Sequence, residues 1–101
     1  MADMIKVKLL KQGTSVRHCV GTTERSCNKC GSWLKHWEKH TNAPINRCCL
    51  CGNKKEVGAH ITIVESDNKE WIIPTWNSCN TSGGIGKTQC DVWAVRAVQC
   101  D

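Results

Sequence analysis

The sequence has no phenylalanine, no tyrosine and only two prolines. Five tryptophans therefore supply all of its aromatic burial, which reserves most of them for the core. No apolar run approaches the ~20 residues of a membrane-spanning helix. Lys6 and Lys8 also interrupt the start of the chain, where a secretory signal would need an unbroken apolar stretch. We therefore expect no membrane segment, no secretory signal and a cytoplasmic location.

Cysteine is abundant, with nine in 101 residues. A chain of this length buries a thin core, and small domains often need disulfides or metal for stability. Without a secretory signal, the cysteines favour metal ligation over a disulfide framework, and their odd number would leave one thiol over. We predict a single zinc-binding domain over residues 1–101, divided into an N-terminal part (1–47) and a C-terminal part (48–101). A disulfide-linked structural protein is the alternative.

Positive charge is concentrated in the first half of the chain. Residues 1–55 hold eleven Lys or Arg and three Asp or Glu, a net charge of +8, whereas residues 56–101 carry −3. A basic segment suits nucleic-acid phosphates or an acidic protein surface. We therefore expect a protein or nucleic-acid partner at the basic N-terminal half, although an ordinary solvated surface explains the same charges.

Alternating and β-branched patterns predict several strands. Ile5, Val7 and Leu9 alternate with lysines, which predicts a half-buried strand with a lysine-lined outer face. Residues 57–64 and 71–74 predict a β-hairpin that Pro74 ends. The segment 90–100 fits a strand or a short helix, with the strand favoured. The segments predicted as loops are 18–31, 42–46 and 81–88.

One short helix is predicted over residues 31–41, with Ser32 as its N-cap. Trp33 and Trp37 are four residues apart, so they share one face of the helix. His36 and His40 have the same spacing and fall beside the tryptophans. Together these patterns predict a small zinc-stabilised α+β fold with a treble-clef-like β-hairpin core, short helices and much loop.

Two C-x2-C-G motifs carry the metal prediction. They are Cys27-x2-Cys30-Gly31 and Cys48-x2-Cys51-Gly52. Tetrahedral zinc commonly takes two thiolates from such a tight turn. Glycine follows the second cysteine in both motifs, where the turn often needs a positive φ. We predict one or two zinc ions per chain.

The second motif precedes the predicted hairpin, which contains His60 and leads to Cys79. A C-x2-C turn, a hairpin and a ligand in the next turn describe a treble-clef zinc site. The predicted ligands are Cys48, Cys51, His60 and Cys79. Cys49 competes with Cys48 because the sequence does not show which sulfur faces the metal. The alternatives are a hydrogen-bonded strand histidine for His60 and a buried thiol for Cys79.

The first motif has less obvious partners. His36 belongs to the helix that follows the motif, and Cys100 would join the two ends of the domain. The predicted ligands are Cys27, Cys30, His36 and Cys100. Other candidates are Cys19, Cys90 and His40. A single site shared by both C-x2-C pairs is the simplest alternative to two sites.

The run RCCLCG…VGAHI…WIIPTWNSCN resembles the core of HNH-type treble-clef proteins, including small bacterial or phage proteins of that type. The resemblance covers roughly residues 27–80. In HNH nucleases the strand histidine is the general base that activates water beside a divalent metal. The resemblance implies that role for His60, and Asn80 matches the family's asparagine.

Several positions depart from the nuclease pattern. Trp76 stands where the family's second knuckle begins with cysteine, Ala59 precedes His60, and no histidine follows His60. If His60 replaces the missing zinc ligand, it is not available as a base. We therefore predict a non-catalytic zinc-binding interaction module, with an HNH-like metal-dependent nuclease using His60 as the alternative.

The stretch SGGIGKT, residues 82–88, resembles the end of a phosphate-binding loop. A full loop needs glycine where Thr81 stands, and it must follow a buried parallel strand and open a helix. The surrounding cysteines leave no room for such a domain. We therefore expect no nucleotide site, and we interpret the glycines as a return loop.

Overall fold

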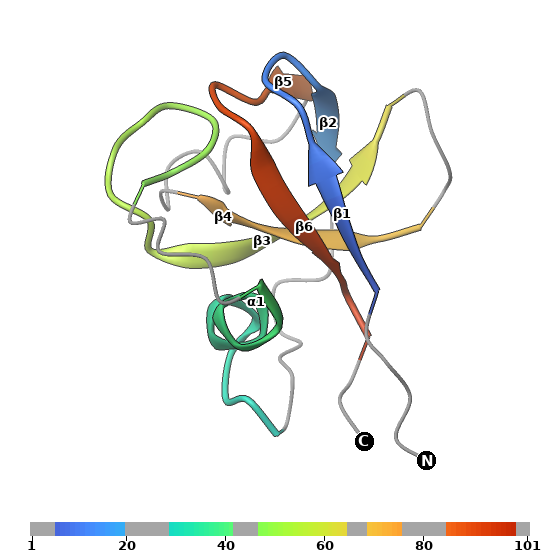
Figure 1. Ribbon diagram of the computed structural model, residues 1–101, viewed down its shortest axis with the longest axis vertical. Helices are drawn as coiled ribbons and strands as arrows, with labels where there is room; N and C mark the ends of the chain where they lie inside the picture. The colour runs from blue at the N-terminus through green and yellow to red at the C-terminus, as the bar shows by residue number, and fades with distance from the viewer. Residues whose placement is uncertain (1–5, 20–28, 42–46, 65–68, 76–84, 99–101) are drawn as a thin grey trace.

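A computed structural model describes residues 6–19, 29–41, 47–64, 69–75 and 85–98. The described residues form a six-stranded antiparallel sheet and one helix (Figure 1). The elements are β1 (Val7–Leu10), β2 (Ser15–His18), α1 (Trp33–Thr41), β3 (Val57–Ile63), β4 (Trp71–Thr75), β5 (Ile85–Lys87) and β6 (Val92–Arg96). The strand order is β1-β6-β4-β3-β2-β5. The predicted small α+β class is therefore confirmed.

The sheet is curled, and α1 lies against its outer surface (Figure 1). The helix contacts β3, β4 and β6. Successive residues of β3 point to opposite sides, as in any strand. Gly58 and His60 face α1, whereas Ala59 and Ile61 are fully buried in the core on the other side. The curled sheet thus encloses one part of the core and buries a second part beneath the helix.

Helix α1 begins where the sequence predicts. Its N-cap, Ser32, accepts a hydrogen bond at Oγ from the backbone N–H of Lys35 at 3.1 Å. Trp33, His36 and Trp37 are buried. The shared tryptophan face is therefore confirmed, and His36 lies with it inside the protein.

The predicted hairpin is also present. β3 and β4 pair antiparallel, with Gly58 opposite Pro74. Pro74 lies within β4 rather than after it, because β6 pairs only with Trp71 and Ile72 on the other edge of β4. The missing N–H of proline therefore costs no ladder hydrogen bond at that position. The segment predicted as either strand or helix forms β6, as favoured.

The inward face predicted for the first strand is wrong. Leu10 is 2% exposed, whereas Val7 and Leu9 are 42% and 37% exposed. Leu10 pairs with the buried Val92, and this register turns the alternate residues of β1 outward. Ile5 lies outside the described residues.

Two of the strands, β2 and β5, are not among those predicted from the sequence. β2 follows the turn at Gly13, and β5 covers residues 85–87 of the presumed return loop. β5 pairs antiparallel with β2 and forms an edge of the sheet. Both strands are too short for a period-two pattern to stand out. No helix within the described ranges is long and apolar enough to span a membrane.

Candidate metal-binding sites

The glycines of both C-x2-C-G motifs have the predicted backbone conformation. Gly31 has φ of 91° and Gly52 has φ of 79°. Residues with a Cβ rarely adopt this conformation, so glycine allows the chain to turn directly after the second cysteine. The positive φ predicted for both glycines is therefore confirmed.

Cys30 and His36 lie side by side, as the first predicted site requires. The Cys30 Sγ atom is 3.7 Å from Nδ1 of His36. Tetrahedral zinc with bonds of about 2.3 Å to sulfur and 2.0 Å to nitrogen separates these two ligand atoms by about 3.6 Å. The observed separation matches that of two ligands on one zinc ion.

The other ring nitrogen of His36 fixes the orientation of the side chain. Its Nε2 lies 3.1 Å from the backbone oxygen of Arg96. A carbonyl oxygen only accepts hydrogen bonds, so Nε2 carries the proton and the lone pair of the neutral ring is on Nδ1. Histidine ligands of metals characteristically donate their second N–H in this way. The ring is fully buried and packs edge-on against Trp33.

The second C-x2-C turn is held by hydrogen bonds to its sulfur atoms. The Leu50 N–H donates to Cys48 Sγ at 3.3 Å, and Asn53 Nδ2 donates to Cys51 Sγ at 3.4 Å. Arg47 and Lys54 pair across the base of the loop. Donors that face sulfur are what a turn holding thiolates needs.

Cys48 and Cys49 have different surroundings, which separates the two competing ligands. Cys49 belongs to the hydrophobic core and is fully buried, and its backbone N–H donates to the oxygen of Pro74. Cys48 lies outside that core cluster and receives the Leu50 N–H at its sulfur. This geometry favours Cys48 over Cys49 as the metal-facing residue.

His60 lies beneath α1 on β3. Its Nδ1 is 3.1 Å from Oε1 of Glu70, and its ring packs edge-on against Trp33. Only 6% of the residue is exposed. The structure thus gives His60 a carboxylate partner that no sequence motif indicated, because the contact depends on the register of the hairpin.

The second C-x2-C turn and the Cys30–His36 pair lie at opposite ends of β6. The Gln89 N–H donates to the Cys49 oxygen just before the strand begins, whereas His36 contacts Arg96, its last residue. Four steps of about 3.3 Å make β6 about 13 Å long. A single zinc ion does not span that distance, so the geometry disfavours one site shared by both pairs.

Three of the eight predicted ligands, Cys27, Cys79 and Cys100, lie outside the described residues. Within the described part of the chain, no three His, Cys, Asp or Glu side chains form a group able to hold a metal ion. The structure brings together Cys30 with His36 and keeps Cys48 and Cys51 in one turn. His60 contacts Trp33 and Glu70, on the α1 side of the sheet.

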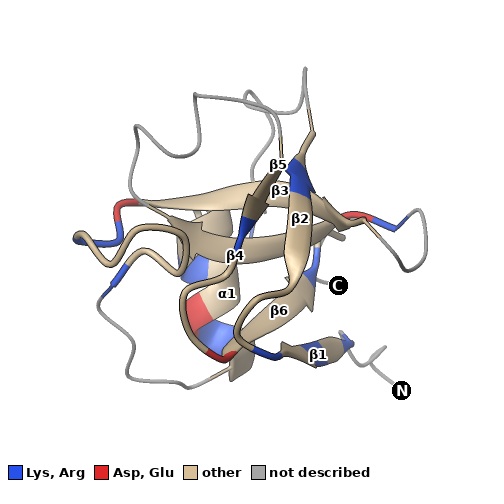
Figure 2. Ribbon diagram, turned by 90° about the horizontal axis from the view of Figure 1, so that it is seen from above, with Lys and Arg blue, Asp and Glu red and all other residues tan. Residues whose placement is uncertain are grey.

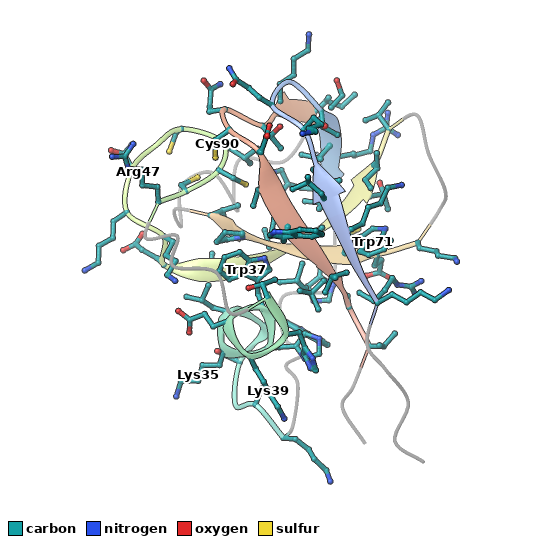
Figure 3. The ribbon with its side chains drawn as sticks, in the orientation of Figure 1. Lys35, Trp37, Lys39, Arg47, Trp71 and Cys90 are labelled. Carbon is teal, nitrogen blue, oxygen red and sulfur yellow. The ribbon has the colours of Figure 1, made fainter. Side chains whose placement is uncertain are left out.

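Two lysines lie on the helix that carries His36. Lys35 and Lys39 are exposed and extend away from the sheet on the outer side of α1 (Figure 3). Burial lowers the pKa of His40. Lysines and arginines are also spread over the strands, and Glu38 on α1 forms an ion pair with Lys55 at 2.7 Å (Figure 2).

Comparisons with protein-family models, with curated proteins and with solved structures find no match for this chain. The interpretation of its sites therefore depends on their geometry.

Proposed function

We propose that the protein is a non-catalytic zinc-binding module that presents a basic surface to a protein or nucleic-acid partner. The observation that carries the proposal is the Cys30–His36 contact of 3.7 Å, with the opposite nitrogen of His36 bonded to Arg96. A metal-free chain would satisfy the same lone pair with an S–H···N hydrogen bond from Cys30, so zinc content distinguishes the two.

Zinc would stabilise the fold by tying separate segments together. Cys30 precedes α1, and the Arg96 carbonyl anchors the end of β6 against the same histidine. Cys27 and Cys100 remain the proposed partners of this pair, by their place in the sequence. The second C-x2-C turn would bind zinc through Cys48 and Cys51. Because metal binding and folding are coupled in small domains, removal of zinc should unfold much of the chain.

Metal content is the direct test. Protein purified from zinc-supplemented cells should contain about two zinc ions per chain by elemental analysis. Cys30→Ser and His36→Gln should each lower that content by about one. Cys49→Ala is the matched control, because Cys49 is a buried core cysteine with no proposed ligand role. Wild-type protein without zinc, or full zinc content in both ligand variants, would contradict the proposal.

The basic surface is tested separately. Lys35 and Lys39 occupy one exposed side of α1, one turn apart. Binding of nucleic acid through these residues should weaken as salt rises, because each phosphate contact releases a counterion. Lys35→Gln/Lys39→Gln should reduce the slope of affinity against salt, with zinc content unchanged. Salt-independent binding, or binding that the double variant leaves intact, would assign the partner surface elsewhere.

A nuclease remains the second candidate because Glu70 contacts His60, and a carboxylate of this kind can orient a general base. The burial of His60 beneath α1 favours a structural role, since a base must reach the substrate. A plasmid-nicking assay with Mg²⁺ or Mn²⁺ distinguishes the two. Nicking by wild-type protein that a folded His60→Ala variant lacks would establish the nuclease.

A further inference from the structure

The segment just before β6 lies against the second C-x2-C turn. The Gln89 N–H donates to the oxygen of Cys49 at 2.6 Å, and the Leu50 side chain lies over Gly86. Cys90 follows directly and is partly buried beside the core. Figure 3 shows Cys90 at this corner of the molecule, with other sulfur atoms gathered around it.

Cys90 was one of the candidate ligands of the first site, but it lies far from that site. It precedes β6, whereas the Cys30–His36 pair meets the other end of that strand at Arg96. The strand between them is about 13 Å long. Cys90 therefore has access to the second turn and not to the first.

We propose that Cys90 is a ligand of the second zinc site, together with Cys48 and Cys51. This inference rests on the proposed zinc-binding function and changes its ligand set. In this ligand set Cys90 takes the place of His60, because the His60 ring faces α1 and contacts Glu70 and Trp33. The fourth tetrahedral position is not assigned to a residue.

The backbone on both sides of Cys90 is held in place. Thr88 exchanges backbone hydrogen bonds with the turn between β1 and β2, and Asp91 accepts the Gln12 N–H at 2.8 Å. The position of Cys90 relative to the turn is therefore set by the fold, as a metal site requires. The three sulfurs do not yet form a metal-holding group. A change of χ1 rotamer moves each sulfur by up to about 3 Å without moving the backbone.

The charges around the turn suit an anionic metal centre. Zinc with three thiolates carries a net negative charge. Arg47 and Lys54 pair at the base of the loop, and both are exposed. Their positive charges would attract an anionic centre at the base of the loop.

Zinc stoichiometry of the full chain tests the assignment. Cys90→Ser should lower the zinc content from about two ions to about one, and Cys90→Ser/Cys30→Ser should lower it to nearly none. His60→Gln should keep both ions. Cys90→His, which restores a ligand, should recover the second ion. In the cobalt-substituted protein, Cys90→Ser should also lower the sulfur-to-cobalt charge-transfer absorption to that of the first site alone.

The outcomes separate this inference from the proposed function. Two zinc ions in Cys90→Ser, or loss of one in His60→Gln alone, would overturn the role of Cys90 and leave the zinc module standing. A wild-type protein without zinc would overturn both. One zinc retained by Cys90→Ser at the Cys30–His36 site would show that the variant is folded.

Discussion

His18 is a titratable ring on the interior side of β2. It pairs with Ile61 and is 8% exposed, and alternate residues of β2 place it on the same side as the fully buried Val16. Its Nδ1 has no hydrogen-bond partner within the described residues. Burial lowers the pKa of His18 because it penalises the charged form.

This burial predicts a specific pH dependence of stability. Between the lowered folded pKa and the unfolded value of about 6.5, the unfolded chain binds more protons, so stability falls as pH falls through this window. We expect His18→Leu to lose less stability than wild type between pH 7 and pH 5, at fixed zinc. Urea unfolding at each pH measures the free energy of unfolding of both proteins. The ionisations that the two proteins share cancel when one curve is subtracted from the other. Parallel curves for the two proteins would contradict it.

The sequence correctly predicted those features of single residues that depend only on near neighbours in the chain. The cap at Ser32 and the positive φ of Gly31 and Gly52 depend on neighbours a few residues away, and all three are confirmed. The Glu70 partner of His60 was not predictable, because it depends on how β3 and β4 pair. Which residues meet across two strands depends on the register of their pairing, and single residues do not determine that register.

At the scale of elements, the packing of α1 on β3 depends on one missing side chain. A Cβ at Gly58 would lie 2.6 Å from backbone atoms of Trp33 and Leu34. Backbone atoms in a helix do not move individually, so a methyl group there would push the whole helix away from the sheet. The close approach brings Trp33 of α1 next to His60 of β3.

We therefore expect Gly58→Ala to destabilise the protein by about 2 kcal/mol or more, as overpacking of a filled core does. Gly86→Ala is the matched control, since its added Cβ would meet only Leu50 side-chain atoms at 3.7 Å, an ordinary contact. Urea unfolding of both zinc-loaded variants gives the comparison. Equal stability of the two variants would show that α1 is not held at Gly58.

The longer helices and strands were easier to predict from the sequence than the shorter ones. The seven-residue β3 and the nine-residue α1 have clear patterns, and both occur where predicted. β1 was placed with its faces reversed, because Leu9 and Leu10 are both apolar and only the pairing of Leu10 with Val92 decides between them. The three residues of β5 become a strand only by pairing with β2.

At the scale of the molecule, Thr88 joins the two ends of the curled sheet. Its N–H donates to the Thr14 oxygen, its Oγ1 donates to the Lys11 oxygen, and its own oxygen accepts the Gly13 N–H. These bonds link the β1–β2 turn to the β5–β6 connection. The residue is 2% exposed, so water does not replace a lost partner.

Thr88→Val keeps the shape of the side chain and removes its hydroxyl. We expect a loss of about 0.5–1.5 kcal/mol, because the hydroxyl's bonds to the Lys11 oxygen and from the Thr14 N–H are lost, while these two groups still bond to each other. Thr88→Ser should retain most of the stability. Hydrogen exchange should accelerate at residues 11–16 in the valine variant. Unchanged exchange there would show that the curl closes without Thr88.

The order of the strands has a consequence for biosynthesis. β6 is the last described strand in the sequence, yet it lies between β1 and β4 in the sheet. During translation, β1 cannot pair with β6 until residue 96 is made, 86 residues after Leu10. At ~5–20 residues per second, β1 therefore stays without this partner for several seconds before the sheet can close.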